Sequence, residues 1–200
     1  MKKINFLYLF ILLFLQSYSQ DINSKLKNAR MGLYVSPTIN FISTDASETE
    51  TSNNVGFIYG WAVEMALNEH HRLESGFAIS YKGGEMTHNS VNFKSDYKVQ
   101  YITIPLFIKM RSREISNFNY FARIGPSINF KIKEKSNSNE QAHSAIIDMS
   151  IFLGTEYSLG GKTAIEGSVF FNNNITDAIQ SDNNSQVLFH QIGLRLGFLF

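Results

Sequence analysis

The chain has 200 residues, enough for one domain, and its charged residues make up 18% of the total with a formal net charge of +1, which does not indicate a nucleic-acid-binding protein. Cysteine is absent, which excludes a disulfide framework, a thiolate metal site, a cysteine nucleophile and a lipidated N-terminal cysteine. Hydrophobic residues reach 44%, with 17 Phe and 9 Tyr, a composition that suits β-strands and the aromatic belts of membrane barrels.

The beginning of the chain has the three parts of a secretory signal peptide. Lys2 and Lys3 are positively charged, an apolar run follows over Phe6–Leu15, and a Ser-Tyr-Ser sequence at 17–19 places small residues before a cleavage site. A membrane-anchoring helix is the alternative, but the apolar run has about ten residues and a spanning helix needs about twenty. We therefore predict a signal peptide over residues 1–19.

The rest of the chain begins with a polar stretch over residues 20–30, which we predict to be a periplasmic lead-in. Eight segments then alternate between apolar and more polar residues with a period of two, which predicts β-strands with one apolar face. They cover residues 31–42, 55–67, 72–82, 97–110, 118–130, 144–157, 163–171 and 187–200. In the clearest of them, large side chains such as Phe57 and Trp61 share one face, and small residues share the other with Glu64.

The connections between these segments alternate in length. Ser43–Asn54, Gly83–Asp96, Lys131–His143 and Asn172–Gln186 are predicted to be long polar loops, and the other connections are short. Bacterial outer-membrane barrels have even strand numbers, short periplasmic turns and longer external loops. The main soluble alternative, a lipocalin-like barrel, would turn its charged residues outward. Here the more polar faces are rich in Gly, Ala and Ser and would make a poor water-facing surface.

The last segment is strongly apolar along one face and ends on Phe200. In a soluble sheet such a strand would leave an aggregation-prone edge, whereas pairing with the first strand would close the sheet into a barrel. We therefore predict an all-β fold: an eight-stranded antiparallel up-and-down transmembrane β-barrel over residues 31–200. Its location would be the outer membrane, with outer-membrane lipid around it.

Two stretches resemble a known family. Residues 101–109, Tyr-Ile-Thr-Ile-Pro-Leu-Phe-Ile-Lys, resemble the Tyr-Leu-Glu-Ile-Pro-Leu-Leu-Leu-Lys stretch of the PorT-like outer-membrane β-barrel family of Bacteroidetes, and Gly125-Pro126 is also similar. The resemblance covers nearly the whole mature chain in strand order and spacing. It implies an outer-membrane location and, from the family's named member, support of protein secretion. Residues that resemble the C-terminal signal read by the barrel-assembly machinery are Gln191, Gly193, Leu196, Phe198 and Phe200.

The more polar faces of the strands carry charges of both signs, which we predict to lie in the lumen. These residues are Glu64, Glu74, Lys82, Lys109, Arg123, Asp148, Glu156, Glu166 and Arg195. An eight-stranded barrel has an interior just wide enough for side chains, so we expect a plug of ion pairs and hydrogen bonds. A narrow ion path or a proton-linked site is the alternative.

The sequence has no nucleophile motif, phosphate-binding loop or zinc-ligand spacing, and we predict no catalytic residue, metal or cofactor. Two function classes stay open. The first is a non-enzymatic barrel whose loops or periplasmic face contact an envelope or secretion protein, in secretion, adhesion or envelope integrity. The second is a small-ligand-binding or hydrolytic barrel that uses the external rim. A closed lumen favours the first, and a compact external pocket of converging polar groups favours the second.

We expect cleavage of the chain near Ser19–Gln20 during export. N-terminal sequencing of the protein recovered from the envelope fraction measures this directly. Recovery of the full-length chain as soluble cytoplasmic protein would contradict the prediction.

Overall fold

The computed structural model describes residues 29–44, 49–88, 93–136, 141–180 and 187–200. The predicted signal peptide and most of the predicted lead-in lie outside these residues. Among the described residues, no helix is long and apolar enough to cross a membrane.

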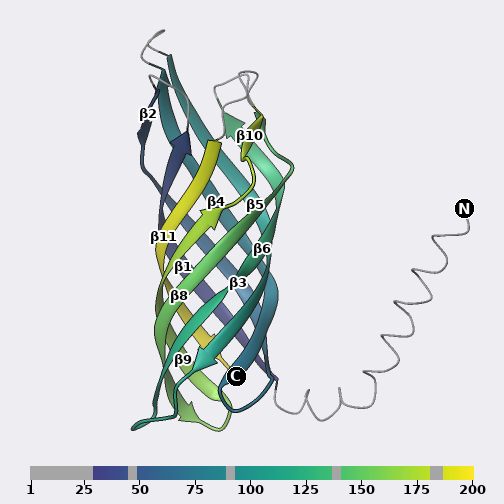
Figure 1. Ribbon diagram of the computed structural model, residues 1–200, viewed down its shortest axis with the longest axis vertical. Helices are drawn as coiled ribbons and strands as arrows, with labels where there is room; N and C mark the ends of the chain where they lie inside the picture. The colour runs from purple at the N-terminus through teal and green to yellow at the C-terminus, as the bar shows by residue number, and fades with distance from the viewer. Residues whose placement is uncertain (1–28, 45–48, 89–92, 137–140, 181–186) are drawn as a thin grey trace, which may run out of the picture.

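Every regular element of the described chain is a β-strand. The strands are β1 (Arg30–Thr44), β2 (Thr49–Ser52), β3 (Asn54–Ala66), β4 (His71–His88), β5 (Phe93–Arg111), β6 (Phe118–Ser136), β7 (Gln141–Ala142), β8 (Ala145–Gly160), β9 (Thr163–Asn174), β10 (Ile179–Gln180) and β11 (Val187–Leu199). The long strands close into one eight-stranded antiparallel barrel, in the order β1, β3, β4, β5, β6, β8, β9, β11 (Figure 1). This confirms the predicted fold class.

The first and last strands seal the barrel, as the apolar C-terminal segment predicts. β1 pairs antiparallel with β11 from Gly32–Leu199 to Thr44–Val187. Beyond Gly32–Leu199, Met31 and Phe200 exchange backbone hydrogen bonds of 2.8 and 2.7 Å. The apolar end of the chain therefore lies within the barrel wall.

Three of the predicted loops are largely strand, and β2 lies inside the predicted Ser43–Asn54 loop. β4 continues to His88 and β5 begins at Phe93, inside the predicted Gly83–Asp96 loop. β6 likewise continues to Ser136, inside the predicted Lys131–His143 loop. The sequence of these extensions lacks the alternation of apolar and polar residues that marks a strand. The backbone ladder between neighbouring strands nevertheless continues.

Apolar side chains cover the outer wall of the barrel. Leu153, Leu194 and Leu196 are 57%, 56% and 60% exposed, and the predicted outward residues Phe57 and Ile104 are also exposed. Trp61 is half-buried on the same face. An apolar surface that encircles the whole barrel is far larger than the patches of soluble monomers and fits a lipid-facing band.

Aromatic rings lie at both ends of this band. At the end with the short turns, the ring centroids of Phe118 and Tyr157 are 4.9 Å apart. At the other end, His190 stacks on Phe41 and Phe171 at 5.3 and 6.2 Å. His190 is the polar exception in the apolar face of the last strand, and its place among aromatic rings is typical of a membrane-interface girdle.

We expect Leu194→Arg to lower the free energy of folding into lipid vesicles by about 2–4 kcal/mol, because it places a charge in the lipid-facing band. The matched control is Leu159→Arg, at the exposed turn-side end of β8, where the cost should fall to about 0–1 kcal/mol. Folding titrations in vesicles measure both values. Equal costs would show that the wall near Leu194 does not face lipid.

Candidate functional site: the layered lumen and its two rims

The interior of the barrel is filled by side chains in layers. Along β8, from the end with the short turns outward, the buried side chains are Glu156, Phe152, Ser150, Asp148 and Ile146. The same order, from charged through aromatic and polar to apolar, is repeated along β1 from Arg30 to Ile42. The lumen therefore has a charged inner part and an apolar outer part. In the topology of outer-membrane barrels, the end with the short turns is periplasmic.

The charged layer takes one side chain from each strand of the barrel, and we call these side chains the charged belt. In order around the wall they are Arg30 (β1), Glu64 (β3), Glu74 (β4), Lys109 (β5), Arg123 (β6), Glu156 (β8), Glu166 (β9) and Arg195 (β11). All of them are 6% exposed or less. Four are acidic and four are basic, so the belt has no net charge.

The sign of the charge alternates in pairs of strands around the belt. Glu64 lies directly opposite Glu74 in the β3–β4 ladder, and Lys109 lies opposite Arg123 in the β5–β6 ladder. Like charges in such direct pairs repel each other. The belt is therefore stable only because each like-charged pair meets the opposite sign on its flanks and across the lumen.

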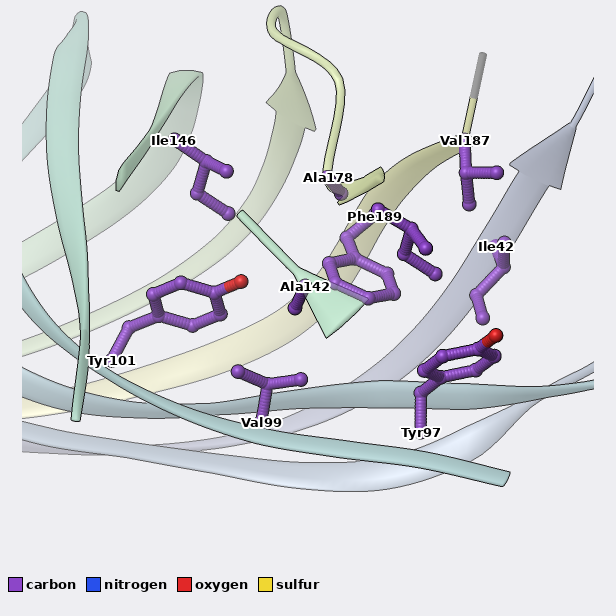
Figure 2. Close-up of a cluster of buried hydrophobic side chains, with 10 residues drawn as sticks. Ile42, Tyr97, Val99, Tyr101, Ala142, Ile146, Ala178, Val187 and Phe189 are labelled. Atoms are coloured by element: carbon purple, nitrogen blue, oxygen red, sulfur yellow. The ribbon is translucent and has the colours of Figure 1, made fainter. Parts of the chain in front are cut away.

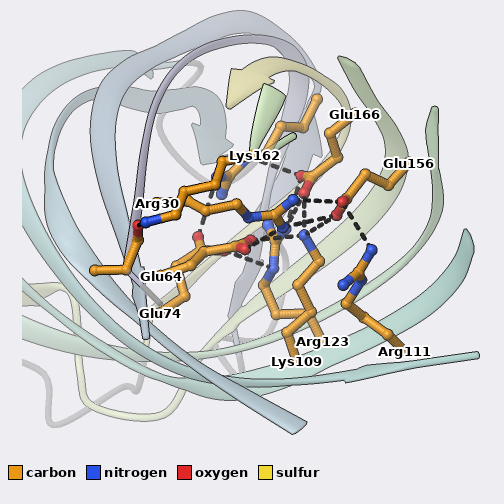
Figure 3. Close-up of polar contacts among 11 residues, drawn as sticks. Arg30, Glu64, Glu74, Lys109, Arg111, Arg123, Glu156, Lys162 and Glu166 are labelled. Atoms are coloured by element: carbon orange, nitrogen blue, oxygen red, sulfur yellow. Dashed lines mark hydrogen bonds and ion pairs between the residues drawn. The ribbon is translucent and has the colours of Figure 1, made fainter. Parts of the chain in front are cut away.

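Lys109 lies at the centre of the belt (Figure 3). Its Nζ is 2.6 Å from Glu64 Oε1, 3.0 Å from Glu156 Oε2 and 2.6 Å from Glu166 Oε2. These three carboxylates offer oxygens within 4.8 Å of one another, an arrangement that could otherwise hold a metal ion. The Lys109 ammonium already lies between them and donates one hydrogen bond to each, so the geometry favours a resident side-chain cation over a metal.

The arginines of the belt are held by carboxylates and by aromatic faces. Arg123 lies 2.6 Å from Glu166 and 3.0 Å from Glu74, and Arg195 lies 3.0 Å from Glu74. The Arg195 guanidinium also lies 3.6 Å from the centre of the Tyr34 ring. Next to the belt on its outer side lies a layer of buried aromatic rings, which we call the aromatic layer. It consists of Tyr34, Phe107, Phe121, Phe152 and Phe170. These rings give the cations of the belt a second favourable contact.

The structure divides the predicted lumenal charges into two groups. Lys82 and Asp148 lie apart from the belt, in the outer half of the lumen, where they form a buried ion pair. Asn129 completes that pair by donating from Nδ2 to Asp148 Oδ2 at 3.0 Å. The other predicted charges all belong to the belt.

Three charged residues of the inner lumen were missed by the sequence reasoning: Arg72, which lies opposite Lys109, and two at strand ends. Arg30 begins β1, one residue before the predicted strand, and lies 2.5 Å from Glu64 and 2.6 Å from Glu156. Arg111 ends β5 and lies 3.0 Å from Glu156. Each is in phase with the inward residues of its own strand, so extending the period of two by one step would have placed both in the lumen.

The outer mouth of the barrel is closed by an apolar cap. Its side chains, drawn in Figure 2, are Ile42, Tyr97, Val99, Tyr101, Ala142, Ile146, Ala178, Ile179, Val187 and Phe189. The short β7–β10 ladder, which pairs Ala142 with Ile179, brings segments from two predicted loops together over the lumen. Beneath the cap, the lumenal cavity lined by Ser36, Phe107 and Asn172 has a volume of only about 30 Å³, room for one or two waters.

The residues of the predicted assembly signal lie on both faces of β11. Leu196, Phe198 and Phe200 face outward, whereas Gln191 and Gly193 face the lumen. Gln191 donates from Nε2 to Asn40 Oδ1 on β1 at 2.8 Å, so it helps join the two sealing strands. Recognition of these residues by the assembly machinery stays a prediction.

Larger open spaces lie at the rims. An outer hollow of about 400 Å³ is bordered by Tyr81, Gln100, Lys133 and Lys135. An inner hollow of about 650 Å³ opens among the short turns, and several cations line it. The chemistry that is open to ligands thus lies at the two ends of the barrel.

The comparisons with known proteins agree with this geometry. A family model described as "Outer membrane protein beta-barrel domain" matches residues 16–198. The outer membrane protein OprG from Pseudomonas aeruginosa has a similar structure, with a TM-score of 0.58 and 12% identity over 86% of this chain and 97% of that chain. Neisserial surface protein A is also similar, with a TM-score of 0.48 and 13% identity over 82% of this chain and 95% of that chain. The likeness to OprG concerns the fold alone. The sequence matches no curated protein.

We expect Glu166→Gln to destabilise the folded barrel by about 3–5 kcal/mol, because it leaves three buried cations with one carboxylate fewer. The matched control is Glu69→Gln in an exposed turn, which should change stability by less than about 1 kcal/mol. Urea unfolding from vesicles measures both. A loss at Glu166 no larger than at Glu69 would mean that the belt does not stabilise the fold.

Proposed function

The chain belongs to the outer membrane protein beta-barrel family and resides in the outer membrane, and from this premise we propose that it is a non-enzymatic barrel that acts through protein contacts at its rims. The observation that carries the proposal is the filled lumen. A charged belt, an aromatic layer and an apolar cap follow one another along the barrel axis. Solute passage would require several of these layers to move, whereas rim contacts require none.

The outer rim offers a built surface for such contacts. β4 and β5 stay paired from the lipid-facing band up to His88 and Phe93, and β6 runs beside β5 to Ser136. These extensions are drawn at the upper end of the barrel in Figure 1. A paired ladder gives up little conformational entropy on binding, which favours recognition by a protein partner.

The alternative, a small-ligand-binding or hydrolytic rim, has less support. The outer hollow is bordered by lysines, amides and apolar groups, and the described residues that line it include no histidine or carboxylate. General acid–base chemistry at neutral pH most often uses such groups. The hollow therefore supports binding better than hydrolysis.

The narrower PorT-like assignment is part of this proposal. It is supported by the resemblance of the Tyr101–Lys109 stretch, which forms the membrane-spanning part of β5. On this assignment the partner would be an envelope or secretion protein. Loss of protein export in a strain that lacks this chain would support the secretion role, and unchanged export would leave adhesion or envelope integrity as the rim's purpose.

We expect that replacing residues 86–95 by Asn-Gly removes partner binding while the barrel still folds. Glu85 and Asp96 are direct partners in the β4–β5 ladder, so a two-residue turn can join them. Crosslinking in whole envelopes, followed by identification of the captured neighbours, compares the shortened and full-length proteins. Folding is checked by the heat-modifiable mobility of the barrel on gels. Undiminished crosslinks would exclude the β4–β5 extension as the contact surface.

The shortened and full-length proteins should both conduct no measurable ionic current in planar bilayers, because the shortened hairpin leaves the belt and the cap in place. Stable, large conductance steps from the full-length barrel would overturn the filled lumen as the basis of the proposed function.

A further inference from the structure

The inner hollow is lined by three guanidinium groups that come from three different strands. They belong to Arg30 on β1, Arg72 on β4 and Arg111 on β5. The turn after β3 and the turn between β8 and β9 border the hollow, so it opens along the barrel axis toward the periplasm. Its volume of about 650 Å³ lies in the range of small-molecule sites, about 300–1,000 Å³.

Arg72 differs from every arginine of the belt because it forms no ion pair among the described residues. It lies opposite Lys109 in the β4–β5 ladder, and its Nε and Nη1 are buried without a hydrogen-bond partner. Within the described residues, no carboxylate lies at ion-pair distance from it. The charges of Arg30 and Arg111 repel it, and Glu64 and Glu156 attract it from beyond ion-pair distance. A half-buried cation without an ion-pair partner is costly, so this position calls for an anion.

The carboxylates closest to Arg72 are already in use. Glu156 Oε1 accepts from Arg30 at 2.6 Å and from Arg111 at 3.0 Å. Glu64 accepts from Arg30 through one oxygen and from Lys109 through the other. The belt itself is neutral, so Arg72 and Arg111 add two positive charges that the buried carboxylates do not balance.

The outer edge of the hollow carries both signs. Glu69, Glu114 and Lys162 line it from the exposed turns, and Lys162 donates to the carbonyl oxygen of Ala29 at 3.2 Å. Exposed carboxylates at the edge are well solvated and neutralise a buried guanidinium only weakly. The imbalance therefore stays concentrated at Arg72.

We propose that this hollow binds an oxyanion, a phosphate or a carboxylate group, on a soluble periplasmic molecule. Arg72 is the primary ligand, and Arg30 and Arg111 supply further positive potential. A guanidinium presents a planar pair of N–H donors that matches both kinds of oxyanion. Because the hollow is larger than one phosphate, the oxyanion is the anchoring group of a larger ligand. The site is separate from the outer rim and does not depend on the function proposed for it.

The test titrates the purified, folded full-length barrel in detergent with inorganic phosphate, at constant ionic strength maintained with chloride. Saturable binding is measured by calorimetry and by the shift of Tm. We expect phosphate to raise the Tm of the unaltered protein, and Arg72→Gln to weaken phosphate binding at least tenfold. The matched control is Arg113→Gln, which removes one positive charge from an exposed position outside the hollow and should leave phosphate binding unchanged.

The change in Tm caused by Arg72→Gln in chloride alone distinguishes a binding arginine from a purely structural one. Because Arg72 is a half-buried charge without an ion-pair partner among the described residues, Arg72→Gln should raise the Tm in the absence of phosphate, whereas loss of a structural contact would lower it. Arg72→Lys keeps the charge but loses the planar fork, and should bind phosphate with intermediate affinity. It also serves as the second variant if Arg72→Gln does not fold.

A parallel titration with succinate identifies the preferred oxyanion. Saturable binding of phosphate, of succinate or of both, weakened by Arg72→Gln, supports the site and names its ligand class. Absence of saturable binding by either anion, or equal binding by the Arg72→Gln and unaltered proteins, overturns the proposal. Neither result bears on the crosslinking test of the outer rim.

Discussion

The fold depends on the neutralisation of buried charge inside a closed barrel. Every wall strand places one ionised side chain in the charged belt, and each like-charged pair of neighbours is compensated by the other sign. Charges in such a poorly solvated space are tolerated only in well-formed pairs. The ion pairs of the belt join side chains from different strands, so complete pairing of its charges requires the closed wall.

The two ends of the lumen are closed by different kinds of side chain. The outer end is closed by apolar side chains that the β7–β10 ladder brings inward, and this closure requires no charge. The inner end is closed by ion pairs and stays partly open to solvent at the turns. Ligands that reach the inner end thus meet a positive surface, whereas ligands that reach the outer end meet an apolar cap surrounded by a raised rim.

The membrane-spanning part of the fold could be predicted from the sequence because lipid imposes a strict period of two on every strand. Where that constraint ends, the prediction is wrong: the sequence of the β4, β5 and β6 extensions has no regular alternation and predicts loops, whereas the structure has strands there. The same limit applies to the candidate site. The alternation of each strand predicts that Lys109 and Glu166 point inward. It does not predict the distance between them, because contacts across the lumen depend on the stagger of strands far apart in sequence.

The alternation of residues also does not predict which charged side chains pair with each other. Lys82 and Lys109 both occupy inward-facing positions of their strands. Lys82 pairs with Asp148 in the outer half of the lumen, whereas Lys109 contacts three glutamates in the belt. The period of two predicts whether a side chain points into the barrel, and the shear of the barrel determines its position along the barrel axis. Only the closed structure contains the second kind of information.

The contrast between Lys109 and Arg72 separates a structural charge from a binding charge. The two residues are direct neighbours in the β4–β5 ladder and both face the lumen. Lys109 uses its three donors on three glutamates, so it has no capacity left for a ligand. Arg72 has buried donors without a partner and lies beside a hollow that opens to the periplasm. Because an uncompensated guanidinium costs stability, its presence next to a fully compensated belt is best explained by an anion that binds from outside the chain.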